Sequence, residues 1–185
     1  MRIVGGRHRG RAIAAPPGRA IRPTSDRVRE SVFNILGHGR AASPIAGARV
    51  LDGFAGTGAM GLEALSRGAD HASFMDTDIA PCRANVAALG EAARARLIEG
   101  DCTRPGPPPE AHDLVFLDPP YGSGLAAPAL GALAGAGWIA ERAVCVLELA
   151  AGEAFEPPGG FSLVDSRKYG AARIEILRLD GGASG

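Results

Sequence analysis

A glycine-rich turn is the first part of the chain that could do chemistry. Residues 51–65 read LDGFAGTGAMGLEAL, in which Gly56-x-Gly58-x-x-Gly61 has the spacing of a nucleotide-binding turn between a strand and a helix. Asp76 lies twenty positions after Gly56, where dinucleotide-binding proteins carry the acid that binds a ribose. The pattern predicts a nucleotide-like ligand on this loop, either a nicotinamide dinucleotide or a molecule without phosphates.

Acidic residues at the ends of successive expected strands favour a cationic ligand. Asp52 would repel the pyrophosphate of a dinucleotide, whereas S-adenosylmethionine carries an ammonium, a sulfonium and no phosphate. We expect Asp52 to attract that ammonium, Asp76 to accept hydrogen bonds from the ribose hydroxyls, and Asp101 to accept one from the adenine amino group. The loop amides near Gly56 and Gly58 would receive the methionine carboxylate.

A rigid turn, Asp118-Pro119-Pro120-Tyr121, follows the fourth expected strand. The prolines fix the backbone and remove two donors, which leaves the Asp118 carboxylate and the Pro119 carbonyl as neighbouring acceptors. Such acceptors suit a planar exocyclic amino group: by holding both hydrogens they localise its lone pair, while the Tyr121 ring stacks on the base. Asp118, or water beyond it, can take the proton afterwards. The turn predicts methyl transfer to an aromatic amine through positioning and electrostatics.

The elements that would position these residues alternate between strand and helix. Residues 161–179 are expected to form an antiparallel hairpin around Gly170. The alternation predicts a mainly parallel sheet with right-handed crossovers, which brings the aspartates above to one edge of the sheet. The pattern predicts strands at 48–54, 71–78, 95–101, 112–122 and 143–149, and helices at 59–67, 79–90 and 125–136.

The N-terminal part of the chain carries most of the positive charge. The whole chain has a net charge of zero, but residues 1–40 hold nine arginines against two acids, a net charge of +7, and the remainder carries −7. We expect residues 1–22 to form a small hairpin or an extended arm. A basic arm on an acidic body favours a polyanionic partner. The candidate phosphate contacts are Arg7, Arg9, Arg11, Arg22, Arg27 and Arg29.

A helix is expected directly after this arm, within RPTSDRVRESVFNIL. Thr24 or Ser25 is the predicted N-cap, and Gly37 or Gly39 the predicted end. Arg27 and Glu30 are expected to point to solvent. The apolar face that would pack on the body consists of Val28, Val32, Ile35 and Leu36.

Length and composition exclude several classes of protein. With 185 residues, of which 46% are hydrophobic, we expect one domain with at most a small appendage. The sequence has no apolar run of the roughly 20 residues that span a bilayer, and no secretory signal pattern. Its three cysteines and four histidines do not cluster, so we expect no metal site, no disulfide framework and a cytoplasmic location.

From Arg2 to about Leu179 the chain resembles a family of bacterial methyltransferases. The glycine loop with Asp-Pro-Pro-Tyr downstream is similar to class I S-adenosylmethionine-dependent enzymes that act on exocyclic amino nitrogens. The segments IVGGRHRGR and RPTSDRVRESVFNIL are similar to the type that methylates the 2-amino group of a guanine in small-subunit (16S) ribosomal RNA, the RsmD type. The resemblance implies an α/β, Rossmann-like fold with a mainly parallel seven-stranded sheet and an antiparallel final hairpin.

The same resemblance implies the division of the chain and its sites. It implies an RNA-contacting extension over residues 1–40, a methyltransferase domain over 41–180 and a disordered tail over 181–185. The implied partner is 16S ribosomal RNA in an assembling small subunit, and a monomer is expected. The tyrosine stands where some members have phenylalanine, which keeps the stacking role. The implied cofactor contacts are Asp52, Phe54, Ala55, Gly56, Thr57, Gly58, Asp76, Asp101 and Cys102, and the implied catalytic residues are Asp118, Pro119, Pro120 and Tyr121.

Other functions remain open from the sequence alone. A related amino methyltransferase could act on DNA adenine or on a protein glutamine, although glutamine enzymes more often have asparagine in place of Asp118 and DNA enzymes usually carry an additional recognition segment. A non-catalytic RNA-binding module would not need the intact loop and turn. A nicotinamide oxidoreductase would need a second catalytic domain. Glu148, at the end of the fifth expected strand, is a further residue that could line the site.

Overall fold

The computed structural model describes residues 1–15, 26–38 and 42–181. The predicted N-cap of the first helix, the candidate RNA contact Arg22 and the tail beyond residue 181 lie outside the described residues. Among the described residues, no helix is long and apolar enough to cross a membrane. The three cysteines are free and buried.

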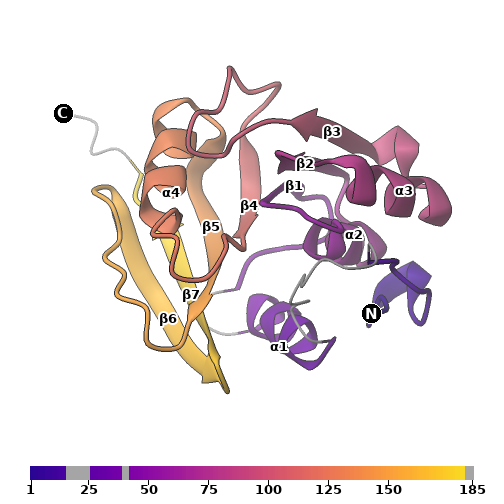
Figure 1. Cartoon of the computed structure of the whole chain (residues 1–185), viewed down its shortest axis with the longest axis horizontal. Coiled ribbons are helices and arrows are strands. Elements are labelled where there is room, and N and C mark those ends of the chain that lie inside the picture. The colour runs from indigo at the N-terminus through magenta and orange to yellow at the C-terminus, as the bar shows by residue number, and fades with distance from the viewer. Residues whose placement is uncertain (16–25, 39–41, 182–185) are drawn as a thin grey trace.

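One seven-stranded sheet organises the protein, in the order β3-β2-β1-β4-β5-β7-β6 (Figure 1). The first five strands pair in parallel, and β7 pairs antiparallel with both β5 and β6. This order confirms the expected fold class, including the antiparallel final hairpin. The strands are β1 (Arg49–Gly53), β2 (His71–Asp76), β3 (Ala95–Glu99), β4 (His112–Leu117), β5 (Ile139–Ala150), β6 (Phe161–Tyr169) and β7 (Ala172–Leu179).

Helices cover both faces of the sheet, and the alternation of side chains along each strand explains why. In β4, Phe116 lies in one hydrophobic cluster and Leu117 in the other. The cluster around Phe116 also contains apolar residues of α1, α2 and α3, whereas the other cluster contains those of α4. Strands buried on both faces are typical of parallel sheets. The α-helices are α1 (Asp26–Gly37), α2 (Ala59–Ser66), α3 (Ala80–Leu89) and α4 (Ala126–Gly135).

Strand β5 is longer than the sequence pattern predicted. It begins at Ile139, which pairs with His112, before the register shifts between His112 and Leu114. Arg142 adopts a left-handed backbone conformation with φ 62° at this irregularity. The apolar pattern did not predict residues 139–142 as part of the strand, because they include charged residues and an irregular backbone.

The N-terminal segment packs onto the body as part of the same core. Arg2 and Ala12 form an antiparallel bridge, and Ile3 and Ile13 are buried in the cluster that holds α1 and α2. A short 3₁₀ helix, η1 (Gly6–His8), lies between them, and a second, η2 (Ala92–Arg94), precedes β3. The hairpin-like arm is therefore fixed to the body, at least over residues 1–15.

Candidate functional site

The glycine loop connects β1 to α2 at the carboxyl edge of the sheet, and two of its glycines are required sterically. Gly58 precedes α2 with φ +78°, and a Cβ there would lie 2.6 Å from the sulfur of Cys82. A Cβ on Gly61 would lie 2.4 Å from the Phe74 ring on β2. The fingerprint spacing thus reflects a left-handed turn followed by close packing of a helix on a strand.

Asp52 lies beneath this loop and joins it to the helix. Its side chain is 3% exposed, and its Oδ2 accepts a hydrogen bond of 2.8 Å from the amide of Gly61. Burial raises the pKa of Asp52 to about 7, with a further contribution from the charge of Asp76, while the Gly61 hydrogen bond opposes the rise. A cation placed near Asp52 would favour its ionised form and lower this pKa again, so binding of a cationic ligand and ionisation of Asp52 would stabilise each other.

Asp76 ends β2 and accepts hydrogen bonds from two backbone amides. Its Oδ2 accepts from Gly56 at 2.8 Å, and its Oδ1 accepts from Asp78 at 2.9 Å. The amide of Gly58 donates to the carbonyl of Ala55 at 2.7 Å. The amide of Gly56 is therefore bonded to β2 and that of Gly58 to the loop itself, so this structure does not support these two amides as contacts of the methionine carboxylate. The predicted contact of Asp76 with a ribose stays a prediction.

Asn85 on α3 supports the loop from below, a role that the sequence analysis missed. Its side-chain amide donates to the carbonyls of Thr57 and Ala14, at 3.0 Å each, and its Oδ1 accepts from the Ala14 amide at 2.9 Å. Asn85 shares the buried face of α3 with Cys82, Val86 and Leu89. A polar residue on an otherwise apolar face was the available signal.

The other predicted cofactor residues lie around this loop with different exposures. Phe54 has a left-handed φ of 56°, and the adjacent Ala55 is tied to β2. Asp101 is exposed, and both the hydroxyl and the amide of Thr103 hydrogen-bond to it and lower its pKa. The side chain of Cys102 is buried in the cluster with α4, and burial raises its thiol pKa to about 12. The structure places these residues around the loop, and their contact with a cofactor stays a prediction.

The Asp-Pro-Pro-Tyr turn follows β4 directly beside the end of β1. The amide of Asp118 faces the carbonyl of Gly53 at 3.5 Å, so the turn and the glycine loop adjoin. The Tyr121 hydroxyl donates to Oε1 of Glu148, on β5, over 2.7 Å. This bond fixes the tyrosine, and no local sequence pattern predicts it because the two residues are 27 positions apart.

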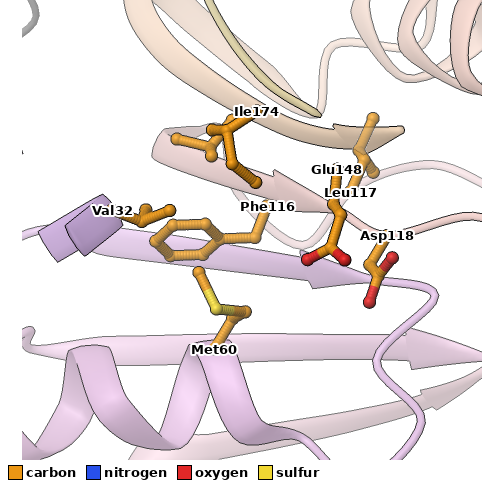
Figure 2. Close-up of a pocket in the computed structure, with 8 residues that line it drawn as sticks. Val32, Met60, Phe116, Leu117, Asp118, Glu148 and Ile174 are labelled. Atoms are coloured by element: carbon orange, nitrogen blue, oxygen red, sulfur yellow. The ribbon is translucent and has the colours of Figure 1, made fainter. Parts of the chain in front are cut away.

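A hollow lies beside the turn, between α1, α2 and the strands β4, β5 and β7 (Figure 2). It has a volume of about 250 Å³, counting its open side. Figure 2 shows the Phe116 ring between Val32 and Met60, with the carboxylates of Asp118 and Glu148 next to each other at one end. An apolar surface that ends in two carboxylates offers acceptors to the edge of a ligand that carries hydrogen-bond donors.

The structure corrects one predicted RNA contact and qualifies two others. Arg29 is fully buried and pairs with Asp26 and Glu63, so its prediction as a phosphate contact is wrong: the guanidinium holds α1 against the body. Arg7 pairs with the buried Glu91. Arg11 is exposed, although its guanidinium donates to the carbonyl of Ala88.

Two further candidate arginines are exposed. Arg9, on the N-terminal segment, and Arg27, on α1, are both exposed. The exposure of Arg27 and Glu30 confirms the predicted outer face of α1. The contact of Arg9 and Arg27 with RNA stays a prediction.

The chemistry of the loop fits S-adenosylmethionine. Asp76 supplies a carboxylate at the cleft, a bound cation would favour the ionised form of Asp52, and the loop backbone allows close approach of a ligand. A methyl donor bound at the loop after β1 would lie next to the Asp-Pro-Pro-Tyr turn after β4, because the two strands are neighbours in the sheet. A sheet of this strand order with these two adjoining sites defines a class I methyltransferase that depends on S-adenosylmethionine.

Comparison with known proteins places the chain more closely. It belongs to the family described as conserved hypothetical protein 95, whose model matches residues 1–178. Ribosomal RNA small subunit methyltransferase D of Escherichia coli is 40% identical over 155 residues, which cover 80% of this chain and 74% of that protein. The protein of the same name from Haemophilus influenzae is 32% identical over 185 residues, covering 96% and 93% of the two chains. These relatives confirm the family resemblance drawn from the sequence.

Solved structures agree with the fold. The yhhF protein of Escherichia coli superposes with a TM-score of 0.82 at 34% identity, covering 98% of each chain. The HI0767 protein of Haemophilus influenzae superposes with a TM-score of 0.78 at 28% identity, covering 97% of this chain and 98% of that one. The likeness extends over nearly the whole chain, so the N-terminal segment is part of the shared architecture.

Proposed function

We propose that this enzyme transfers a methyl group from S-adenosylmethionine to the exocyclic 2-amino group of one guanine in small-subunit (16S) ribosomal RNA. The observation that supports this most is the adjacency of the glycine loop and the Asp-Pro-Pro-Tyr turn, at the ends of the paired strands β1 and β4. The names of the relatives from Escherichia coli and Haemophilus influenzae support ribosomal RNA as the substrate.

The turn would activate the amino group by holding it. The Asp118 carboxylate and the Pro119 carbonyl accept one amino hydrogen each, so that the nitrogen lone pair is less delocalised into the ring. The Tyr121 ring, held by Glu148, sets the plane of the base. When bound, the donor supplies a methyl group made electrophilic by a positive sulfur. The nitrogen loses a proton after methylation, to Asp118 or to water.

The glycine loop would orient the donor toward that nitrogen. We propose Asp76 for the ribose, Asp52 for the ammonium, and Asp101 for the adenine amino group. Positioning of the two reactants in line supplies most of the rate enhancement that such a site needs. No residue has to act as a strong base.

The exposed arginines of the N-terminal segment would contact the RNA backbone. Arg9, Arg11 and Arg27 are the described candidates, and Arg22 is a further candidate outside the described residues. We also propose that the substrate is an assembling small subunit, that the enzyme acts as a monomer, and that it works in the cytoplasm where ribosomes assemble. A chain of this size would gain specificity from a shape that ribosomal proteins help to form.

Transfer of a tritiated methyl group to small subunits that lack the modification tests the function. Nucleoside analysis of the product should show N2-methylguanosine at one position of the RNA. Asp118→Ala should abolish transfer while donor binding, measured by titration, stays largely intact. Asp113→Ala is the matched control, because Asp113 lies at the opposite end of β4 and pairs with Arg49.

The outcomes separate the alternatives. A methyl group on a ring carbon, on a ribose oxygen, on DNA adenine or on a protein glutamine would contradict the proposal. Comparable methylation of protein-free RNA and of particles would contradict only the assembling subunit as substrate. Full transfer by Asp118→Ala would remove the turn from the reaction.

A further inference from the structure

Two carboxylates share the end of the hollow, and the proposed mechanism uses only one of them. Asp118 follows Leu117, and Leu117 is in register with Leu147 on the neighbouring parallel strand β5. Asp118 and Glu148 are therefore the next pair along β4 and β5, and their side chains project to the same face as Phe116 and Val146. Figure 2 shows the two carboxyl groups pointing the same way, at the end of the hollow.

We infer that Glu148 reads the N1 hydrogen of the target guanine and so determines which base the enzyme accepts. This inference rests on the proposed function. Guanine presents N1–H and the 2-amino group side by side, a row of donors that two neighbouring carboxylates can accept. Adenine and cytosine present an unprotonated ring nitrogen next to their amino group. A carboxylate opposite that lone pair is repelled, so Glu148 excludes both bases.

Glu148 is held in the orientation that this role needs. Its side chain is 9% exposed, and its Oε1 accepts the hydrogen bond from Tyr121 at 2.7 Å. A carboxylate has about four acceptor positions, so this bond orients the group and still allows it to accept a base hydrogen. The residue that fixes the stacking ring is thus also the one that contacts the base edge. Both features of the target, its plane and its hydrogen-bond pattern, depend on Glu148.

A base analogue separates this reading role from a structural one. 2-Aminopurine keeps the 2-amino group but has a lone pair in place of the N1 hydrogen. Small subunits are reconstituted with RNA in which the mapped guanine is replaced by 2-aminopurine, and kcat/KM is compared with that of the guanine substrate. We expect the wild-type enzyme to prefer guanine by about 100-fold, because a mismatched donor–acceptor pair is worth a discrimination of that order.

Glu148→Gln is the informative variant, since its amide can donate to the N1 lone pair of 2-aminopurine. We expect its preference for guanine to fall to about tenfold or less, with a higher kcat/KM on 2-aminopurine than the wild type. Glu141→Gln is the control: it makes the same change at an exposed position near the start of β5, so the preference should remain at the wild-type value. Donor titration shows for each variant that the fold and the cofactor site are intact.

Two results would overturn the inference. The first is a wild-type enzyme that methylates both substrates equally, a measurement that needs no variant to fold. The second is a Glu148→Gln variant that keeps the wild-type preference; if it also loses activity equally on both substrates with donor binding unchanged, Glu148 only supports Tyr121. Methylation of guanine at another atom would instead refute the proposed function itself, and the inference with it.

Discussion

Glu63 and Arg29 form an ion pair in which both side chains are fully buried, with Oε2 of Glu63 3.5 Å from Nε of Arg29. Glu63 also accepts hydrogen bonds of 2.8 Å from the amides of Val4 and Gly5, and one of 2.7 Å from Arg67. One carboxylate on α2 thus holds α1 and the N-terminal segment. Because α2 begins at the glycine loop, this network connects the arm to the site.

Glu63→Gln should destabilise the whole protein. We expect the free energy of unfolding to fall by about 1–3 kcal/mol, because the variant removes the buried counter-ion of Arg29 and leaves its pair with the partly exposed Asp26. Urea unfolding measures the change. Glu30→Gln on the exposed face of α1 is the control and should stay within about 0.5 kcal/mol of the wild type. Equal effects of the two substitutions would mean that the buried network contributes little.

The parts of the site that sequence reasoning found are those whose chemistry is local. The glycine loop was predicted because its spacing encodes a left-handed turn and a close helix, which Gly58 and Gly61 now show. The Asp-Pro-Pro-Tyr turn was predicted because prolines at a strand end restrict the backbone whatever surrounds them. The alternation of strands and helices predicted a mainly parallel sheet, which the structure confirms, but not the order of its strands.

The parts that it missed depend on contacts between distant segments. Arg29 was assigned to the solvent because it is charged, yet it lies three, four and seven positions before Val32, Phe33 and Leu36, on the buried stripe of α1. Its counter-ion, Glu63, is on another helix, and no local pattern pairs the two. The bond between Tyr121 and Glu148 likewise requires that β4 and β5 be neighbours.

Gly61→Ala should distort the proposed donor site by pushing α2 away from β2. The added methyl group would lie 2.4 Å from the Phe74 ring, which has to move with β2. We expect a loss of about 1–3 kcal/mol in unfolding free energy, as for other overpacked cores, together with weaker donor binding. Gly131→Ala inside α4 is the matched control, because its Cβ would meet only Pro158 at 3.9 Å. That variant should be neutral or more stable by up to about 1 kcal/mol in thermal unfolding.

Neutralising Arg9, Arg11 and Arg27 together should weaken RNA binding. If each contacts one phosphate, the slope of log K against log salt should become shallower by about 2–3, and donor affinity should not change. Filter binding over a salt series measures the slope. Arg142→Gln is the control, because Arg142 is exposed near the start of β5, at the edge of the sheet opposite the proposed site. An unchanged slope in the triple variant would exclude the arm as the RNA contact.

The stability of the protein should depend on pH through Asp52. Its folded pKa is raised from 3.8 to about 7, so between these values the folded state binds more protons than the unfolded state. Stability from this group is therefore present at about pH 4 and is lost as the pH rises to 7, by at most about 1.4 kcal/mol per pH unit. Asp52→Asn keeps an oxygen for the Gly61 amide and cannot ionise, so it should lack this loss. The difference between the two urea-unfolding curves from pH 4 to 8 isolates the effect, because the other titrating groups are common to both. Parallel curves would show that Asp52 is ionised throughout this range.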